Sequence, residues 1–187
     1  NLNANTTYYF ALFEYNGSSG KVFLTSTSTV PTPGASASQQ TAAYPTINTA
    51  SVYFDAPQVD YLRGRVSGYG NGARRIMVVK KDSPVDALPV DGMDYTPSAT
   101  FGLGSNLGND NFVVHDGPGG NYTHINGLQA NTTYYAKVFE YNGTGSTTTY
   151  LTGIDANGNP PPEGSLSTLS TPTVQASNIT FSDVLGE

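Results

Sequence analysis

Residues 128–143 read Leu-Gln-Ala-Asn-Thr-Thr-Tyr-Tyr-Ala-Lys-Val-Phe-Glu-Tyr-Asn-Gly, and an earlier copy of this stretch occupies residues 2–17. Twelve of the sixteen positions are identical, and the copies are offset by 126 residues, as from Tyr8 to Tyr134. A second signal repeats at nearly the same offset, because Pro45-Thr46-Ile47 returns as Pro172-Thr173-Val174. The sequence therefore predicts a tandem array, with one complete unit framed by parts of its neighbours.

The repeat divides the chain into five predicted parts. They are residues 1–28, the C-terminal strand hairpin of a preceding repeat; 29–44, a linker; 45–155, the complete domain; 156–171, a second linker; and 172–187, the first strand of a following repeat. The linkers are predicted from their Pro, Ser and Thr content. Because an apolar strand face needs cover, we expect Tyr8, Phe10 and Leu12 of the hairpin to pack against 172–187 or against another copy of the chain.

Composition favours an all-β fold with a hydrophobic core. Charged residues make up only 12% of the chain, hydrophobic residues make up 37%, and there are 13 Tyr and 21 Gly. Short stretches that alternate polar and apolar residues are separated by turn signals such as Asn71-Gly72, and no stretch shows sustained helical periodicity. We predict a Greek-key β-sandwich of seven short strands.

A long insertion follows the third predicted strand, which spans residues 74–81. Residues 82–111 are rich in Pro, Gly, Asn and Asp, and a structureless loop of this length is unusual inside a compact domain. Its apolar residues are Tyr95, Phe101, Leu103 and Leu107, so we expect it to pack on the sheet. Residues 76–79 are apolar without alternation, which indicates a strand covered on both faces.

The pattern Leu-x-Ala-x-Thr-x-Tyr, formed by Leu128, Ala130, Thr132 and Tyr134, resembles the Leu-x-Pro-x-Thr-x-Tyr signature of the fibronectin type III domain. The resemblance implies an immunoglobulin-like sandwich in which the Tyr134 hydroxyl bonds back to upstream backbone, a tyrosine corner. Ala replaces the signature Pro in both copies, no core Trp is present, and the insertion exceeds a standard member's loop. In its details the chain looks like repeats of long secreted bacterial surface proteins, which implies a secreted or cell-surface location.

The acidic balance excludes some classes of partner. A net charge of −6 and a pI near 4.7 give no basic footprint for nucleic acid or an anionic membrane. No apolar run is long enough to insert into a membrane. The absence of Cys excludes disulfides and zinc-thiolate chemistry, and we expect no cofactor. The expected partners are neighbouring repeats, with polysaccharide or another surface protein as further candidates.

Strand alternation from Tyr134 places a second set of aromatic side chains, Tyr135, Phe139 and Tyr141, on the outward face. These three residues are a candidate platform for a sugar or a partner protein. The alternative is that the insertion lies over them, and the two-sided apolarity of 76–79 favours this alternative.

The same alternation turns Glu140 inward, where a carboxylate needs a partner. Arg74 or Arg75 of the neighbouring strand could provide it, so we predict a structural ion pair and not a catalytic acid. His115 and His124 could meet across a turn and bind a metal, although histidines at turns are usually plain surface residues.

Two oxygen-rich segments are weak calcium candidates. Asp155, Asn157 and Asn159 alternate as ligands of calcium loops do, but the Glu that closes such a loop is missing. The second segment comprises Asn106, Asn109, Asp110 and Asn111. For both segments the alternative is an Asn-Gly turn or an ordinary loop, so no metal site is predicted.

The sequence contains no constellation that indicates catalysis, and we predict that the protein is not an enzyme. The leading hypothesis is a non-catalytic tandem repeat that serves as a stalk or adhesion spacer in a secreted or cell-surface bacterial protein. The alternative is a carbohydrate-binding accessory module attached to a secreted polysaccharide-degrading enzyme.

Overall fold

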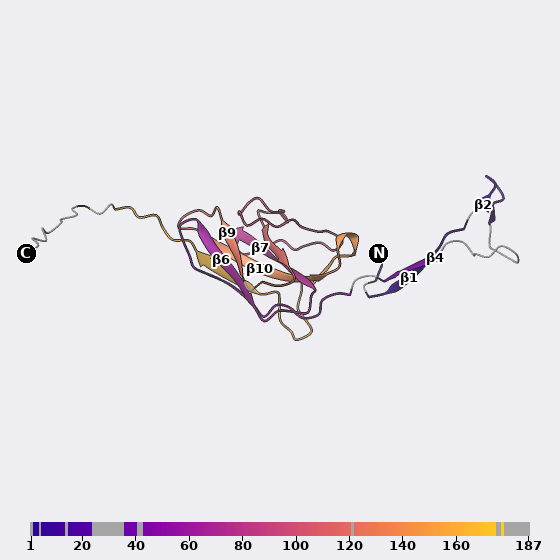
Figure 1. The fold of residues 1–187 in the computed structure, drawn as a ribbon, viewed down its shortest axis with the longest axis horizontal. Coiled ribbons are helices and arrows are strands. Elements are labelled where there is room, and N and C mark those ends of the chain that lie inside the picture. The colour runs from indigo at the N-terminus through magenta and orange to yellow at the C-terminus, as the bar shows by residue number, and fades with distance from the viewer. Residues whose placement is uncertain are drawn as a thin grey trace, which may run out of the picture.

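The computed structural model describes residues 2–3, 5–13, 15–23, 36–40, 43–120, 122–174 and 177. Two antiparallel sheets form the central domain (Figure 1). One has the order β5-β6-β9, with β5 Ser51–Asp55, β6 Tyr61–Ser67 and β9 Tyr122–Asn126. The other has the order β11-β10-β7-β8 with β12 also on β10, and comprises β7 Arg74–Lys81, β8 Phe112–Gly117, β10 Thr133–Asn142, β11 Thr149–Tyr150 and β12 Glu163–Ser167. The prediction of an all-β, sandwich-like fold is confirmed.

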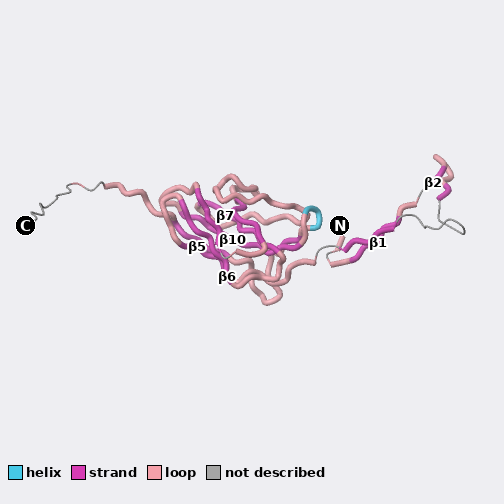
Figure 2. Tube along the Cα trace, viewed as in Figure 1, coloured by secondary structure: helices cyan, strands magenta, loops and turns pink. Residues whose placement is uncertain are grey.

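The only helix among the described residues is η1, a single 3-10 turn at Gly145–Thr147 (Figure 2). No helix in the described part of the chain is long and apolar enough to cross a membrane.

The main hydrophobic cluster lies between the two sheets. It takes alternate residues from each strand, such as Val52 and Phe54 from β5 and Tyr134, Ala136 and Val138 from β10. Alternation of this kind follows from the period of two in a strand, which puts successive side chains on opposite faces. All members of the main cluster fall within residues 52–166, so the segment 45–169 contains a complete core.

A second hydrophobic cluster lies on the outer face of the five-stranded sheet, beneath the insertion. Ile76, Val78, Val113, Phe139 and Tyr141 of the sheet pack there against residues of the insertion and of β11, namely Val85, Tyr95, Leu107 and Tyr150. The prediction that residues 82–111 pack on the sheet is therefore confirmed. Two of the expected anchors behave differently, because Phe101 packs against the main cluster and Leu103 is exposed.

The insertion also closes an open side of the sandwich. Its backbone bonds to β8 through Val113 N–H to Ser105 O at 2.9 Å, and to β9 through Asn126 N–H to Ala99 O at 2.8 Å. An added Cβ at Gly104 would lie 2.0 Å from Val113 O, so only glycine permits this approach. Edge strands that would otherwise invite pairing with another chain are covered in this way.

The predicted linker 156–171 is wrong in its central part, because residues 163–167 form strand β12. Its register places Leu166 opposite Tyr134 of β10, and the bonds of the chain to the domain continue to Leu169. The inward positions of this strand are Gly164 and Leu166. A Cβ at Gly164 would lie 2.4 Å from Val52 O, so close packing requires glycine here and the usual apolar alternation is absent from the sequence.

The N-terminal region repeats the strand pairs of the domain. β1 (Thr7–Ala11) pairs with β4 (Ser36–Gln40), and β2 (Tyr15–Asn16) pairs with β3 (Val22–Phe23). The predicted hairpin is confirmed only for β2 and β3, and the predicted linker 29–44 is wrong where it contains β4. A Ser- and Gln-rich stretch gave no apolar alternation from which this strand could be predicted.

The apolar face of β1 is not covered within the described part of the chain. Phe10 and Leu12 are exposed, and Tyr8 is only partly buried. Residues 172–174 leave the domain at the end opposite to β1 (Figure 1), so packing of the hairpin against them is wrong. The remainder of 172–187, apart from 177, lies outside the described residues, and cover by another copy stays a prediction.

Both copies of the repeated stretch form the same corner. The Tyr134 hydroxyl accepts a hydrogen bond from Gln129 N–H at 2.9 Å, and the Tyr8 hydroxyl accepts one from Asn3 N–H at 2.7 Å. Asn131 and Asn5 have φ of 50° and 51°, a left-handed conformation that Asn tolerates better than most residues. Thr132 donates to Ala130 O at 3.0 Å, and Leu128 is buried in the main cluster.

Replacing Tyr134 by Phe removes the acceptor of the corner and leaves a part-buried N–H unpaired. We expect Tyr134→Phe to lower the free energy of unfolding of the domain by about 1–3 kcal/mol, measured by urea denaturation. The matched control is Tyr8→Phe, which removes the same bond outside the domain and should leave that transition unchanged. Equal effects of the two changes would contradict the assignment.

Candidate functional site

The most deeply buried charged pair joins the two longest strands near one end of their pairing, where the last pair is Tyr141 and Arg74. Glu140 of β10 lies opposite Arg75 of β7, and Arg75 Nε–H donates to Glu140 Oε1 at 3.0 Å. The exposed fractions of the two side chains are 0% and 4%, respectively. Thr49 Oγ1 and the backbone N–H of Gly70 also donate to Glu140 Oε1. The predicted structural ion pair is confirmed, with Arg75 as the partner.

The surroundings of this pair are closely packed. Arg75 also donates to Pro118 O at 2.9 Å, and its guanidinium lies 4.3 Å from the centre of the Tyr69 ring. A Cβ at Gly70 would lie 2.1 Å from Ile47 O, and one at Gly72 would lie 2.7 Å from Glu140 Oε2. The Gly-Asn-Gly loop therefore packs closely over the carboxylate.

The outer aromatic residues of β10 are not an exposed platform. Phe139 is 0% exposed and Tyr141 is 5% exposed, because Tyr95, Val85 and Leu107 of the insertion cover them. The Tyr141 hydroxyl donates to Asp116 Oδ1 at 2.7 Å, and burial together with this bond raises the pKa of Tyr141 to about 12. Tyr135 alone keeps partial exposure. The candidate ligand face of Tyr135, Phe139 and Tyr141 is therefore wrong, because these residues form a mainly buried layer.

The loop at Asp155 is built around hydrogen bonds from nitrogen. The Asp155 carboxylate accepts from the backbone N–H groups of Asn159 and Asn157, both at 2.8 Å, and of Asn48 at 3.1 Å. The backbone donor at Asn159, followed by those at Asn48 and Asn157, lowers the pKa of this carboxyl despite its desolvation. N–H groups already surround these oxygens, which favours the turn interpretation over a calcium loop. A groove of about 620 Å³ runs beside this loop, but Asp155, Asn159 and the Asn48 amide nitrogen are committed to these internal bonds.

The second oxygen-rich segment is also a turn. Asn109 and Asp110 have φ of 52° and 60°, and Asn106 Oδ1 accepts from Gly108 N–H at 2.8 Å. The buried Asn111 side chain donates to Asp86 Oδ1 at 2.7 Å and so ties the two ends of the insertion together. Among the described residues, no three His, Cys, Asp or Glu side chains come together in a way that could hold a metal ion.

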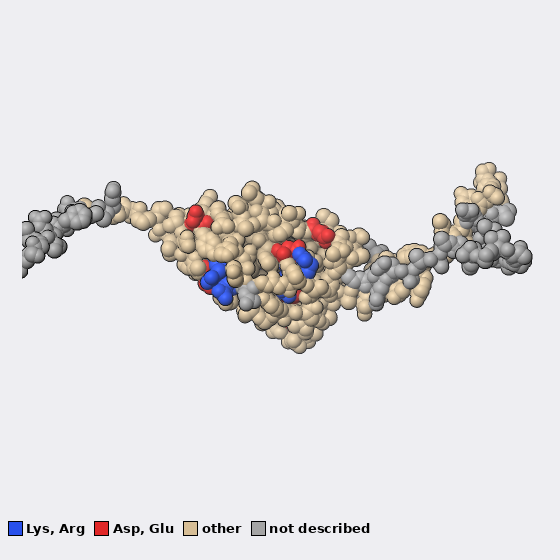
Figure 3. Space-filling view, viewed as in Figure 1, with Lys and Arg blue, Asp and Glu red and all other residues tan. Residues whose placement is uncertain are grey.

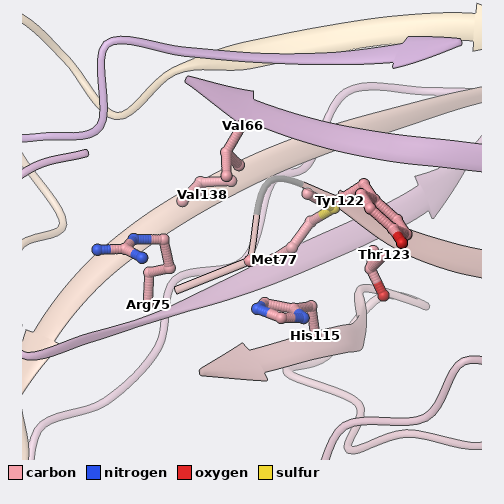
Figure 4. A pocket seen from close by; sticks show the side chains of 8 residues that line it. Val66, Arg75, Met77, His115, Tyr122, Thr123 and Val138 are labelled. Carbon is pink, nitrogen blue, oxygen red and sulfur yellow. The ribbon is translucent and has the colours of Figure 1, made fainter. Parts of the chain in front are cut away.

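The two histidines lie on different sheets. His115 of β8 lines an internal cavity of about 10 Å³, enough for one water molecule, together with Val66, Met77 and Val138 (Figure 4). Burial is the main reason why the pKa of His115 is lowered, so its imidazole is neutral at pH 7. His124 of β9 is exposed, and its Nδ1 lies 2.7 Å from the Tyr61 hydroxyl.

The outer face of the three-stranded sheet carries an aromatic surface that the sequence analysis missed. We call the outward residues Tyr53, Tyr61, Arg63, Arg65, Tyr122 and His124 the tyrosine–arginine face. Tyr53 is 43% exposed and Tyr122 is 51% exposed. Cross-strand pairing brings the residues together, because Arg65 lies opposite both Tyr53 and Tyr122. The sequence signal for this face is the period of two within β5, β6 and β9.

This face is locally basic on an acidic protein. Arg63 Nε–H donates to Asp55 Oδ1 at 2.6 Å, and Arg65 Nη1 donates to Asp55 Oδ2 at 3.3 Å. Two guanidinium groups therefore share one carboxylate, and the bond from Arg63 is the main reason why the pKa of Asp55 is lowered. The Arg65 Nε atom is buried without a hydrogen-bond partner. Charged side chains are sparse on the surface that Figure 3 shows.

Neutralising Glu140 leaves the Arg75 charge buried without a counter-ion. We expect Glu140→Gln to lower the free energy of unfolding by about 3–5 kcal/mol, measured by urea denaturation. The control is Glu163→Gln, which removes a surface ion pair with Lys137 at 2.6 Å and should change stability by less than about 1 kcal/mol. A loss at Glu140 no larger than that at Glu163 would show that the buried pair is not required.

Comparison with known proteins adds no assignment to this geometry. No protein-family model matches the chain, and no curated protein is similar to it in sequence. The function is therefore argued from the repeat, the strand pairing and the surfaces described above.

Proposed function

We propose that the chain is a segment of a non-catalytic tandem array of fibronectin type III-like repeats, which acts as a stalk or adhesion spacer of a secreted or cell-surface bacterial protein. The observation that carries the proposal is the repeated strand register. Tyr8 pairs with Gln39 as Tyr134 pairs with Leu166, and Tyr15 pairs with Phe23 as Tyr141 pairs with Tyr150. In each case both partners are displaced along the chain by the offsets at which the sequence itself repeats.

The family assignment is supported by strand order and by the corner. Sheets ordered β5-β6-β9 and β8-β7-β10-β12 suit a Greek-key sandwich with three and four main strands. The Tyr134 hydroxyl bonds to backbone just before β10, as a tyrosine corner does. A large apolar insertion over β7 and β10 distinguishes this unit from the simplest member of such a family.

A non-catalytic role is supported by the state of the buried polar groups. Glu140, Asp155 and Asn111 each receive or donate several internal hydrogen bonds. Groups held in this way stabilise loops and strand registers. A spacer requires stable units joined in a line, and near-identical neighbouring sequences satisfy that requirement without any ligand.

The second candidate function is polysaccharide binding at the tyrosine–arginine face. The observation that favours it is the exposure of Tyr53 and Tyr122 next to two arginines on a flat sheet. Tyrosine and arginine are the residues most enriched where binding energy concentrates. This face replaces the row on β10 as the place where a sugar ring could stack.

The spacer proposal predicts that units added in tandem lengthen the molecule. The test uses concatemers of one, two and three copies of residues 44–170, a segment of one full period that holds the complete core. We expect every copy to unfold at the same temperature and the maximum dimension in small-angle X-ray scattering to increase with each copy. Side-by-side compaction with no gain in length would overturn the spacer role.

Polysaccharide binding predicts a specific effect of the tyrosines. If a panel of cellulose, chitin and peptidoglycan retains the protein, we expect the double variant Tyr53→Ala and Tyr122→Ala to weaken retention by about tenfold or more. The matched control is Tyr135→Ala, a partly exposed tyrosine on the other sheet. No retention by any member of the panel, or equal loss in the control, would count against this second function.

A further inference from the structure

The segment that enters the domain is held by side chains from two later loops. Asn142 Nδ2 and Thr149 Oγ1 both donate to the carbonyl oxygen of Ala43, at 2.8 and 3.2 Å. The Tyr44 hydroxyl donates to Asp91 Oδ2 of the insertion. These contacts lie ahead of the first core residue, Val52, so they serve to fix the incoming chain and not to build the core.

The loop before β7 holds Thr46 and Ile47, which follow Pro45. Asn71 Oδ1 accepts from the backbone N–H groups of Thr46 and Ile47, both at 2.9 Å. The Asn71 amide also donates to Thr46 Oγ1 at 2.9 Å. Together with the contacts of Ala43 and Tyr44, these bonds fix the continuous stretch 43–47. A flexible linker would make no such bonds to the domain.

The tip of the insertion is itself firmly seated, so it can act as an anchor. Asp91 Oδ1 accepts from Tyr150 N–H at 2.8 Å, and Gly92 N–H donates to Thr148 O at 2.8 Å. Asp94 accepts from Gly145 N–H at 2.8 Å and from the Thr148 hydroxyl at 2.6 Å. The tip therefore rests on η1 and β11, at the end of the domain where the N-terminal segment enters.

The distance between the preceding repeat and this anchor is short. Gln40 is paired with Thr7 at the end of β4, and Ala43 is the first residue tethered to the domain. Three residue steps separate them, which even a fully extended chain covers in about 11 Å. The last strand of the preceding repeat must therefore end next to the insertion tip.

The exit from the domain is tethered in the same manner. Thr168 Oγ1 donates to Gln129 O at 2.6 Å, Leu169 N–H donates to Gln58 O at 2.9 Å, and Asn131 N–H donates to Leu169 O at 3.1 Å. By the offset that relates Pro45 to Pro172, Thr168 and Leu169 correspond to Thr41 and Ala42, which lie outside the described residues. In a tandem array of this period, the exit tether at Leu169 is followed by only one residue, Ser170, before the next unit begins at the position of Tyr44.

Apolar side chains stand exposed on either side of the anchor. Val90 is 59% exposed and Met93 is 53% exposed, and they flank Asp91 in one tight turn closed by Met93 N–H to Val90 O at 3.3 Å. Most large apolar residues at the surface of a domain need no explanation, but these two lie where a short tether brings another repeat.

We propose that the insertion tip, residues 88–94, is the receiving half of a joint that holds consecutive repeats in a fixed end-to-end orientation. The occupant of this surface is the preceding repeat of the same array, so the inference rests on the proposed spacer function and deepens it. The Asp91 carboxylate holds the Tyr44 hydroxyl, and Asn142 and Thr149 hold the carbonyl of Ala43. Val90 and Met93 stay exposed with β1 and β4 present, so the strands that complete the preceding repeat are the ones that cover them. The insertion has two roles, cover of the second hydrophobic cluster and stiffening of the array.

The test uses the two-copy concatemer of residues 44–170, in which Tyr44 stands at the joint between the copies. We expect the wild type to scatter as an extended rod, with one narrow interdomain peak in the pair-distance distribution. Tyr44→Phe in the second copy should broaden this peak and speed amide hydrogen exchange at Thr46 and Ile47 by about tenfold, as loss of one hydrogen bond implies. The matched control is Tyr53→Phe, which removes an exposed hydroxyl far from the joint and should change neither readout.

A second variant tests the contact made by Val90 and Met93 and leaves the hydrogen bond between Tyr44 and Asp91 in place. Val90→Ser together with Met93→Ser in the second copy should also broaden the interdomain peak, while the melting temperature of a single unit stays unchanged because both side chains are exposed there. If the wild type is a narrow rod and neither variant changes it, the joint is overturned and the spacer function stands. If the wild-type copies lie side by side, the spacer function fails together with the joint.

Discussion

The buried pair of Glu140 and Arg75 is the constraint to which the rest of the domain conforms. Two charges removed from water are stable only when every remaining donor and acceptor is satisfied, and here Thr49, Gly70 and Pro118 complete the set. These partners come from the entry segment, the loop before β7 and the turn after β8. The ion pair therefore fixes the register of β7 against β10 and brings three segments to the same end of the sandwich, two through the Glu140 carboxylate and one through the Arg75 guanidinium. The Gly-Asn-Gly loop lies against it because no side chain fits there.

The chain also enters the domain at that end of the sandwich. The burial of β10 explains why so many hydrogen bonds form there. The strand is buried on both faces, with Tyr134 in the main cluster and Phe139 in the second. Cover on the outer face has to come from outside the two sheets, and the insertion provides it. Once seated, its tip extends over β11 toward the entry segment. Burial of the outer aromatic row thus removes one candidate binding face and creates the anchor for Tyr44.

The sequence predicted what depends on local alternation or on a residue needing a partner. The inward Glu140 and the cover over Phe139 follow from the parity of one strand, whereas the corner of Tyr134 was expected from the resemblance of its signature to a known family. Strand β12 was not predicted because its inward position 164 is a glycine and not an apolar side chain. Glycine is required there because Val52 O lies too close for a Cβ atom. The tyrosine–arginine face joins residues of three strands, and no single stretch reveals it. The hydrogen bond from Tyr44 to Asp91 could not be predicted from the sequence, because the two residues are 47 positions apart and no local pattern relates them.

The repeat itself indicates how such a joint varies along an array. Thr171 occupies the position that corresponds to Tyr44, because each directly precedes the proline of the repeated Pro-Thr signal, Pro172 and Pro45. A threonine hydroxyl sits one carbon from the backbone and does not reach as far as a phenol. The hydrogen bonds to the backbone carbonyl of Ala43 involve no side chain of the linker. They can therefore form whatever residue occupies that position. In the proposed array, the joint at Thr171 therefore keeps the backbone tether and lacks the phenol that Tyr44 provides.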